Sequence, residues 1–197
     1  REEAGDRAGV LWCLEKELEF DPESISTLRQ VAVHLERDDP AAASKTWSKI
    51  GEIAAAREDA PLEAEALEKI SGLLPPEPSC LQRLASLYFR NANPEKGLEA
   101  LERKAILLEE LGNPEEAART VDQMLEHAPQ RADFLRKRIF LARALNDSTA
   151  LLHRSRQYYF LLYERGGTEE ALAVGEEICR EFGDPLDVLD RKSTRLN

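Results

Sequence analysis

Apolar side chains recur along the chain at helical spacing, and short breaks rich in Gly, Asn and Pro interrupt them. Between two such breaks, Leu81, Leu84, Ala85 and Tyr88 lie three or four residues apart, on one face of a helix. The break at 91–94 ends in a proline, which suits the first turn of the next helix because its missing N–H would be unpaired there. This pattern predicts an all-α chain of about nine or ten antiparallel helices. They are expected near residues 6–20, 24–37, 41–58, 61–73, 81–90, 94–111, 114–127, 132–146, 149–165 and 168–181.

The same pattern returns along the chain about every 54 residues. Val10, Ala64, Ala117 and Ala171 follow similar breaks, at steps of 54, 53 and 54 residues. Each period holds three helices, so we expect one array over residues 1–190. Its three-helix repeats cover about 23–76, 77–129 and 130–185, with partial repeats at both ends.

The two ends of the array carry no obvious polar caps. Residues 186–189 look like the start of a further repeat, whereas residues 191–197 are polar and basic and form a non-repeat tail. A complete solenoid is expected to have capping repeats. We therefore expect this chain to be a piece of a longer array.

Composition excludes several classes of protein. The chain of 197 residues has 27 Lys and Arg against 38 Asp and Glu, a formal charge of −11. A sequence pI near 4.9 argues against nucleic acid as the main ligand, since that binding rests on neutralising phosphates. No apolar stretch approaches the roughly 20 residues of a membrane helix, and no signal segment opens the chain. We expect no membrane insertion and a cytoplasmic location.

Catalytic and metal-binding patterns are absent from the sequence. The three cysteines are far apart and are expected to be small buried hydrophobic residues rather than disulfide or zinc ligands. The three histidines lie in different repeats without ligand-like neighbours, and no nucleophile or phosphate-loop motif occurs. We expect no cofactor, no metal and no enzymatic activity. These residues are Cys13, Cys80, Cys179, His34, His127 and His153.

One segment departs from the acidic character of the chain. Residues 131–165 hold eight Arg and Lys against three acids, a local charge of +5. Two interpretations stay open for these arginines: they pair with acids of adjacent repeats, or they form a basic, aromatic-lined patch for an acidic peptide, which a planar guanidinium can bind with two hydrogen bonds. The aromatic residues could instead pack between helices. The candidates are Arg136, Arg143, His153, Arg154, Arg156, Phe160 and Tyr163.

The span from Leu98 to Pro129 resembles a tetratricopeptide repeat (TPR), a helical hairpin of 34 residues. The residues that carry the resemblance are Leu101, Ala105, Leu108, Gly112, Ala117, Val121, Met124 and Pro129. The resemblance implies a right-handed α-solenoid of helical hairpins whose first helices line a concave groove. It places Arg156, Phe160 and Tyr163 in that groove, together with Glu102, Ile106 and Glu109. The period of 53–54 residues departs from the family, because it gives three helices per repeat rather than two.

These observations favour a non-catalytic interaction module that binds a peptide or helix of a partner protein in the groove, the partner segment being acidic. The alternative is a regulatory or sensor repeat domain of a larger signalling protein. An enzyme is the weakest hypothesis, and RNA binding has the basic segment as its only support.

Overall fold

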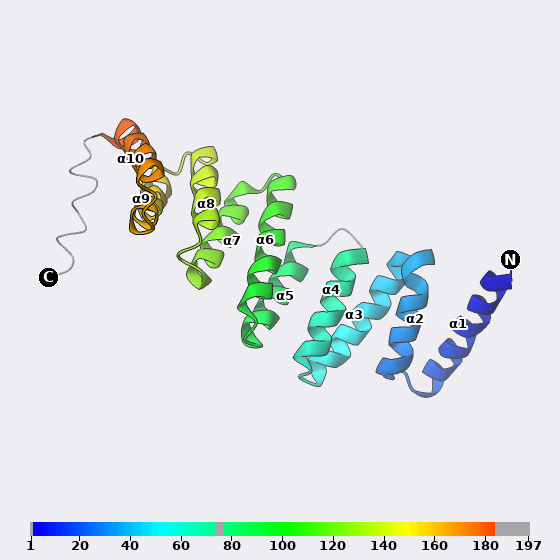
Figure 1. The fold of residues 1–197 in the computed structure, drawn as a ribbon. Coiled ribbons are helices and arrows are strands. Elements are labelled where there is room, and N and C mark those ends of the chain that lie inside the picture. Colours follow the sequence, from blue (N-terminus) through cyan, green and yellow to red (C-terminus); the bar gives the residue numbers. More distant parts are fainter. Residues whose placement is uncertain (1, 74–76, 184–197) are drawn as a thin grey trace. The chain divides into compact units, whose positions relative to one another are not determined.

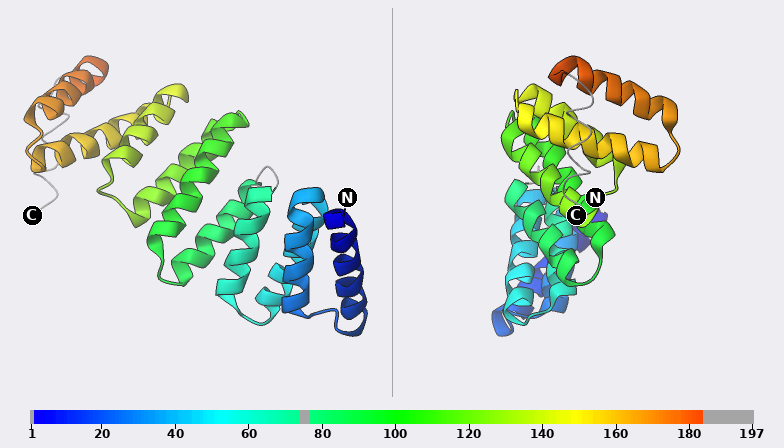
Figure 2. Two further views of the ribbon diagram at one scale, coloured as in Figure 1. Left: turned by 45° about the vertical axis from the view of Figure 1, so that its right-hand side comes forward. Right: turned by 90° about the vertical axis from the view of Figure 1, so that its left-hand side faces the viewer.

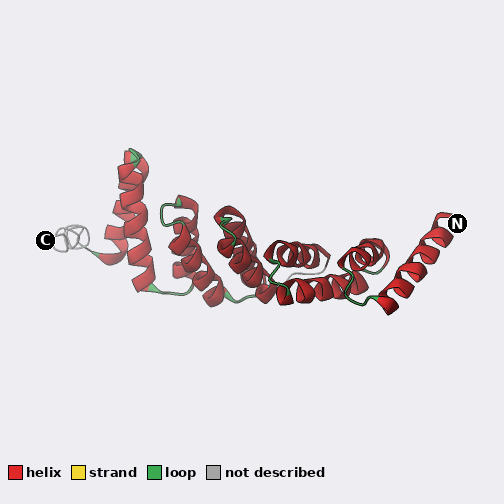
Figure 3. Ribbon diagram, turned by 90° about the horizontal axis from the view of Figure 1, so that it is seen from below, coloured by secondary structure: helices red, strands yellow, loops and turns green. Residues whose placement is uncertain are grey.

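The computed structural model describes residues 2–73 and 77–183, and these residues form ten helices joined by short loops (Figure 1). No strand occurs in these two ranges, which confirms the all-α prediction (Figure 3). The segments 186–189 and 191–197, predicted as a further repeat and a tail, lie outside the described residues. The helices are α1 (Glu2–Phe20), α2 (Ile25–Asp38), α3 (Pro40–Ala56), α4 (Ala60–Leu73), α5 (Pro78–Arg90), α6 (Pro94–Glu110), α7 (Pro114–His127), α8 (Ala132–Ala144), α9 (Ser148–Glu164) and α10 (Thr168–Phe182).

The chain divides into two compact units, Arg1–Ala100 and Leu101–Asn197, here called unit 1 and unit 2. In unit 1, each helix from α1 to α4 packs against the next one; in unit 2, α7 to α10 do the same. The helix α6 begins in unit 1 and ends in unit 2. Figure 2 shows the antiparallel course of consecutive helices, most clearly for α9 and α10. The grouping into three-helix repeats stays a prediction.

The helix boundaries follow the period found in the sequence. The helices α3, α6 and α9 begin at residues 40, 94 and 148, and α4, α7 and α10 begin at 60, 114 and 168, so every start follows its predecessor by 54 residues. Residues 54 apart therefore occupy equivalent positions from α3 onward, which allows one part of the chain to serve as a reference for another.

Equivalent side chains cap equivalent helices. The carboxylates of Asp39 and Asp147 accept the backbone N–H of the residue three positions on, at 3.0 Å each, at the starts of α3 and α9. The side-chain oxygen of Asn93 does the same at 3.4 Å at the start of α6. A cap of this kind satisfies an N–H that has no partner inside the helix, so it fixes where each helix begins.

The hairpin turns depend on left-handed backbone positions. Gly112 and Gly166, at φ 71° and 78°, end the turns after α6 and α9 as predicted for Gly112. The equivalent position after α3 is Glu58, which adopts φ 56° despite its side chain. Ala92 and Asn146 are also left-handed, in the turns before α6 and α9.

Small residues let neighbouring helices approach. Ala105 of α6 and Ala117 of α7 are both fully buried, as the close contact of a helical hairpin requires. Where a large residue replaces a small one, the facing residue is small: Tyr159 of α9 lies at the position of Ala105, and its ring is 3.2 Å from an ideal Cβ built on Gly175 of α10. The predicted misfit of the third repeat is thus relieved by a glycine on the next helix.

The cysteine prediction was partly wrong. Cys13 is exposed on α1, and Cys80 and Cys179 are half-buried, so none of the three is a fully buried core residue. Cys13 is exposed because the described part of the chain packs only α2 against α1, which leaves much of the α1 surface open.

Candidate functional site

The predicted basic segment forms α8, α9 and the turns beside them, and most of its cations pair with acids inside unit 2. These ion pairs are Arg131–Asp133 at 2.6 Å, Lys137–Glu109 at 2.8 Å, Arg138–Asp122 at 3.0 Å, Arg143–Glu177 at 2.8 Å and Arg154–Asp122 at 2.8 Å. The internal-pairing interpretation is therefore correct for two of the predicted site residues, Arg143 and Arg154.

A single carboxylate joins three helices of unit 2. Asp122 on α7 accepts a hydrogen bond from Arg138 Nε of α8 at 3.0 Å and another from Arg154 Nη2 of α9 at 2.8 Å. Arg138 is only 6% exposed, and its Nη2 lies 3.6 Å from a carboxylate oxygen of Asp147. A charge at this depth requires such partners, because burying it unpaired is costly. We name Asp122, Arg138 and Arg154 the carboxylate clamp.

The remaining predicted contacts of this region are also internal. Arg143 of α8 reaches α10, where it pairs with Glu177 and, at 3.4 Å, with Glu181. The hydrogen bond from Arg131 lowers the pKa of Asp133 below its usual value, so this carboxylate stays ionised near neutral pH.

Two predicted arginines differ from the rest. Neither Arg136 nor Arg156 forms a hydrogen bond or ion pair with any described residue. Arg156 of α9 borders a hollow of about 420 Å³, which also includes Ser148, Thr149, Leu152, His153 and Phe182. This hollow brings two of the predicted site residues, His153 and Arg156, to one place with apolar and hydroxyl groups.

The imidazole in this hollow is biased towards its neutral form. Partial desolvation lowers the pKa of His153, and the positive charges of Arg154 and Arg156 lower it further. A neutral imidazole offers one donor and one acceptor, whereas Arg156 offers donors only. The pair can therefore bind a carboxylate next to a neutral polar group.

The predicted aromatic residues of α9 form a short cluster around Tyr159. Its ring lies edge-on to Phe160, with centroids 5.3 Å apart, and parallel to Tyr163, with centroids 6.5 Å apart. Tyr163 is 62% exposed, so its outer face is open to a ligand. Phe160 is half-buried, which agrees in part with the packing interpretation.

The structure does not unite the α6 candidates with one another in a single contact. Glu109 pairs with Lys137 of α8, whereas Glu102 and Ile106 point to solvent. Sequence reasoning missed Phe140 of α8, a large apolar residue that is exposed on unit 2. It also missed the importance of Asp122, although Glu68 at the equivalent position of α4 is a signal that an acid recurs there.

Metal and membrane chemistry receive no support from the described part of the chain. It contains no group of three or more His, Cys, Asp or Glu side chains placed to hold a metal ion. Its helices are all too short or too polar to cross a bilayer.

The helical hairpins match the pattern that the sequence suggested. Ala105 and Ala117 face each other's helices as fully buried residues, and Gly112 turns the chain between them in the left-handed conformation. The fold is TPR-like.

Comparisons with known proteins add similarity to this TPR-like chain. No family model matches the sequence, and no curated protein matches it. Among solved structures, nearly identical TPR-like repeats from Podosopora anserina are 14% identical, with 95% of this chain and 96% of that chain covered and a TM-score of 0.36. YrrB, a TPR protein with an unusual peptide-binding site, is 15% identical, with 83% and 97% covered and a TM-score of 0.31. PilF of Pseudomonas aeruginosa is 10% identical, with 99% and 100% covered and a TM-score of 0.31.

Proposed function

We propose that this chain is a non-catalytic protein-binding module that holds an acidic peptide segment of a partner against α9. TPR-like repeat domains generally act in protein interactions, and the charges of unit 2 narrow the choice of ligand. The observation that carries the proposal is the state of Arg156: it borders the hollow on α9, and no described acid neutralises it.

The unpaired arginine can bind a carboxylate more readily than its neighbours can. Arg154 would have to give up Asp122, and Arg143 would have to give up Glu177, before either could bind a ligand. Arg156 breaks no internal pair, so the interaction with a ligand carboxylate is gained in full. A charge-assisted hydrogen bond of this kind contributes about 1.5–3 kcal/mol.

Apolar surface near the arginine can add affinity. Leu152 and Phe182 border the same hollow, and the exposed ring of Tyr163 lies two helical turns further along α9. An acidic segment that also carries an apolar or aromatic residue would use both kinds of surface. We therefore expect ligands of mixed acidic and apolar character rather than purely acidic ones.

Charge reversal tests the proposal. Arg156→Glu should weaken binding of a fluorescein-labelled acidic and aromatic peptide by at least about tenfold while leaving the far-ultraviolet circular dichroism unchanged. Arg119→Glu is the matched control, because Arg119 is an exposed cation of α7 away from the hollow. Equal binding by the Arg156→Glu and Arg119→Glu proteins would refute the proposal.

The same experiment separates the ligand site from the carboxylate clamp. Arg154→Glu places an acid beside Asp122, so it should lower the stability of unit 2 as well as any binding. If Arg154→Glu removed binding without any change in stability, Arg154 rather than Arg156 would be the ligand residue.

A further inference from the structure

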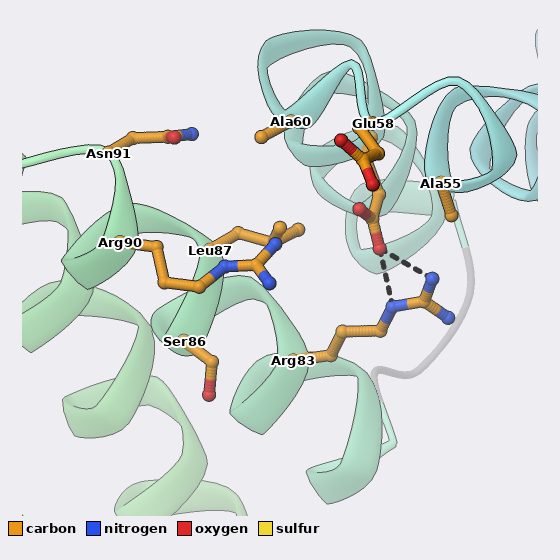
Figure 4. A pocket seen from close by; sticks show the side chains of 9 residues that line it. Ala55, Glu58, Ala60, Arg83, Ser86, Leu87, Arg90 and Asn91 are labelled. Atoms are coloured by element: carbon orange, nitrogen blue, oxygen red, sulfur yellow. Dashed lines mark hydrogen bonds and ion pairs between the residues drawn. The ribbon is translucent and has the colours of Figure 1, made fainter.

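Unit 1 contains a hollow of about 760 Å³ between α4, α5 and the turn that joins α3 to α4. It is far from the predicted residues in sequence, and it lies wholly within unit 1 (Figure 4). Leu87 contributes an apolar part of its lining, and the polar groups around it belong to Glu58, Glu63, Arg83, Ser86 and Arg90.

One wall of the hollow is a fixed ion pair. Glu63 of α4 is only 6% exposed, and its Oε1 accepts a hydrogen bond from Arg83 Nε of α5 at 2.6 Å. The equivalent positions in α7 and α10 hold Ala117 and Ala171, which are buried small residues. Unit 1 therefore carries a buried acid where the other helices have alanine, and this acid holds Arg83 beside the hollow.

Two charges of the hollow remain without a partner. Neither the carboxylate of Glu58 nor the guanidinium of Arg90 forms a hydrogen bond or ion pair with a described residue. Figure 4 shows Arg90 reaching from α5 into the hollow and Glu58 entering it from the turn after α3. Arg83 and Glu63 neutralise each other, so the free groups are one cation and one anion.

The position of Glu58 is costly for an ordinary residue. Its φ of 56° is left-handed, and the equivalent positions in the other two turns are Gly112 and Gly166. A side chain in this conformation meets a steric penalty that glycine avoids. Ala92 and Asn146 show that the chain tolerates such positions elsewhere. What distinguishes Glu58 is that the strained residue delivers a carboxylate to a hollow, and strain of this kind is concentrated at functional sites.

We propose that the hollow binds a short peptide segment of a partner protein that carries one acidic and one basic side chain. The acid pairs with Arg90 and the base with Glu58, while the apolar stem of the basic residue lies over Leu87. The hydroxyl of Ser86, which donates to the carbonyl of Gln82 at 2.9 Å, keeps its oxygen lone pairs for a ligand N–H.

The charges disfavour other ligands of similar size. A phosphate or another dianion would meet the carboxylates of Glu58 and Glu63, and a divalent cation would meet the guanidinium groups of Arg83 and Arg90. A volume of about 760 Å³ is in the range that binds ligands of a few residues. A doubly charged peptide matches both the volume and the two free charges.

Nuclear magnetic resonance titration of the full chain tests this proposal. The probes are four capped peptides of one glycine-rich sequence that carry Glu and Lys, Glu and Gln, Gln and Lys, or two Gln at the same two positions. The peptide with Glu and Lys should shift the resonances of Ser86, Leu87 and the Arg90 side chain in a saturable way. Each singly charged peptide should bind about tenfold more weakly, because it forms one charged contact instead of two.

Variants assign the two contacts. Arg90→Glu should abolish the preference for the acidic position, and Glu58→Gly, which installs the residue of the other turns, should abolish the preference for the basic one. Lys45→Glu is the control for net charge, because Lys45 is an exposed cation on α3. It should leave all four affinities unchanged.

The proposal is overturned if the four peptides bind equally, if none shifts these resonances, or if Arg90→Glu acts no more strongly than Lys45→Glu. It is independent of the α9 proposal. Loss of peptide binding at Arg156 leaves the resonances of unit 1 as they are, and the converse holds as well.

Discussion

The carboxylate clamp provides a sharp test of the packing in unit 2. Asp122→Asn keeps the shape of the side chain but removes the charge that holds Arg138 and Arg154. One amide oxygen then replaces two carboxylate oxygens, so at most one of the two hydrogen bonds keeps a good acceptor. Arg138 would retain only the weaker pair with Asp147, at 3.6 Å.

The expected loss lies between two known limits. Exposed ion pairs contribute about 0–1 kcal/mol, whereas removing one partner of a buried pair costs about 3–5 kcal/mol. The side chain of Arg138 is 8% exposed and that of Asp122 is 32% exposed, so the pair is buried on one side only. We expect Asp122→Asn to lower the free energy of unfolding by about 2–3 kcal/mol.

Urea unfolding followed by far-ultraviolet circular dichroism measures this loss. Both tryptophans, Trp12 and Trp47, lie in unit 1, so tryptophan fluorescence records the other unit in the same titration. Asp133→Asn is the matched control, because its pair with Arg131 is about half exposed and should contribute less than about 1 kcal/mol. If Asp122→Asn and Asp133→Asn unfold at the same urea concentration, the clamp does not stabilise unit 2.

A second substitution shows whether the loss comes from the buried guanidinium. Arg138 occupies the position of Leu84, which is fully buried in α5. Arg138→Leu in the Asp122→Asn background removes the charge that lacks its partner. The combined loss should therefore be smaller than the sum of the two single losses by about 1–2 kcal/mol. An additive result would show that the two side chains do not interact.

Three further substitutions or titrations test other parts of the structure. Gly97→Ala should destabilise unit 1 by about 1 kcal/mol, because its Cβ would lie 2.8 Å from the ring of Phe89; Gly9→Ala in α1 meets nothing within 4 Å and should instead stabilise by about 0.5–1 kcal/mol in thermal unfolding. Ala117→Leu should lower the unfolding free energy by about 1–3 kcal/mol, since the site has no space; an unchanged melting temperature would show that the hairpin register is wrong. The proton resonances of His153 should titrate below pH 6.5 in the folded chain, so the contribution of this residue to stability should fall as the pH drops below 6.5; a pKa above 6.5 would contradict the described surroundings of the ring.

The sequence predicted the helices well because their signals are local. The proline of 91–94, the glycine at 112 and the capping side chains each act within one turn of the chain, so the bounds of α6 and α7 could be inferred without any tertiary contact. The period of 54 residues then extended the inference to the neighbouring helices.

The state of the charged side chains could not be inferred in the same way. Asp122 binds arginines that lie 16 and 32 residues away, and the residues of a basic segment look alike before the helices are packed. Sequence reasoning therefore grouped Arg154 with Arg156, although the first is engaged and the second is not. The burial of Glu63 was missed for a related reason, because Ala64 beside it seemed to be the small residue of the hairpin.

The recurring acid of α4 and α7 has a consequence for how such a chain finds one arrangement among similar helices. Glu68 accepts a hydrogen bond from Tyr88 of α5 and lies 3.8 Å from Lys96 of α6, much as Asp122 serves α8 and α9. Apolar surfaces of Leu and Ala tolerate a slip of one helical turn, since another apolar residue takes the vacated place. A slip of about 5.4 Å would separate every one of these polar contacts at once. The acids thus act like the notches of a key, making mispaired helices detectable during folding at a small expense in stability.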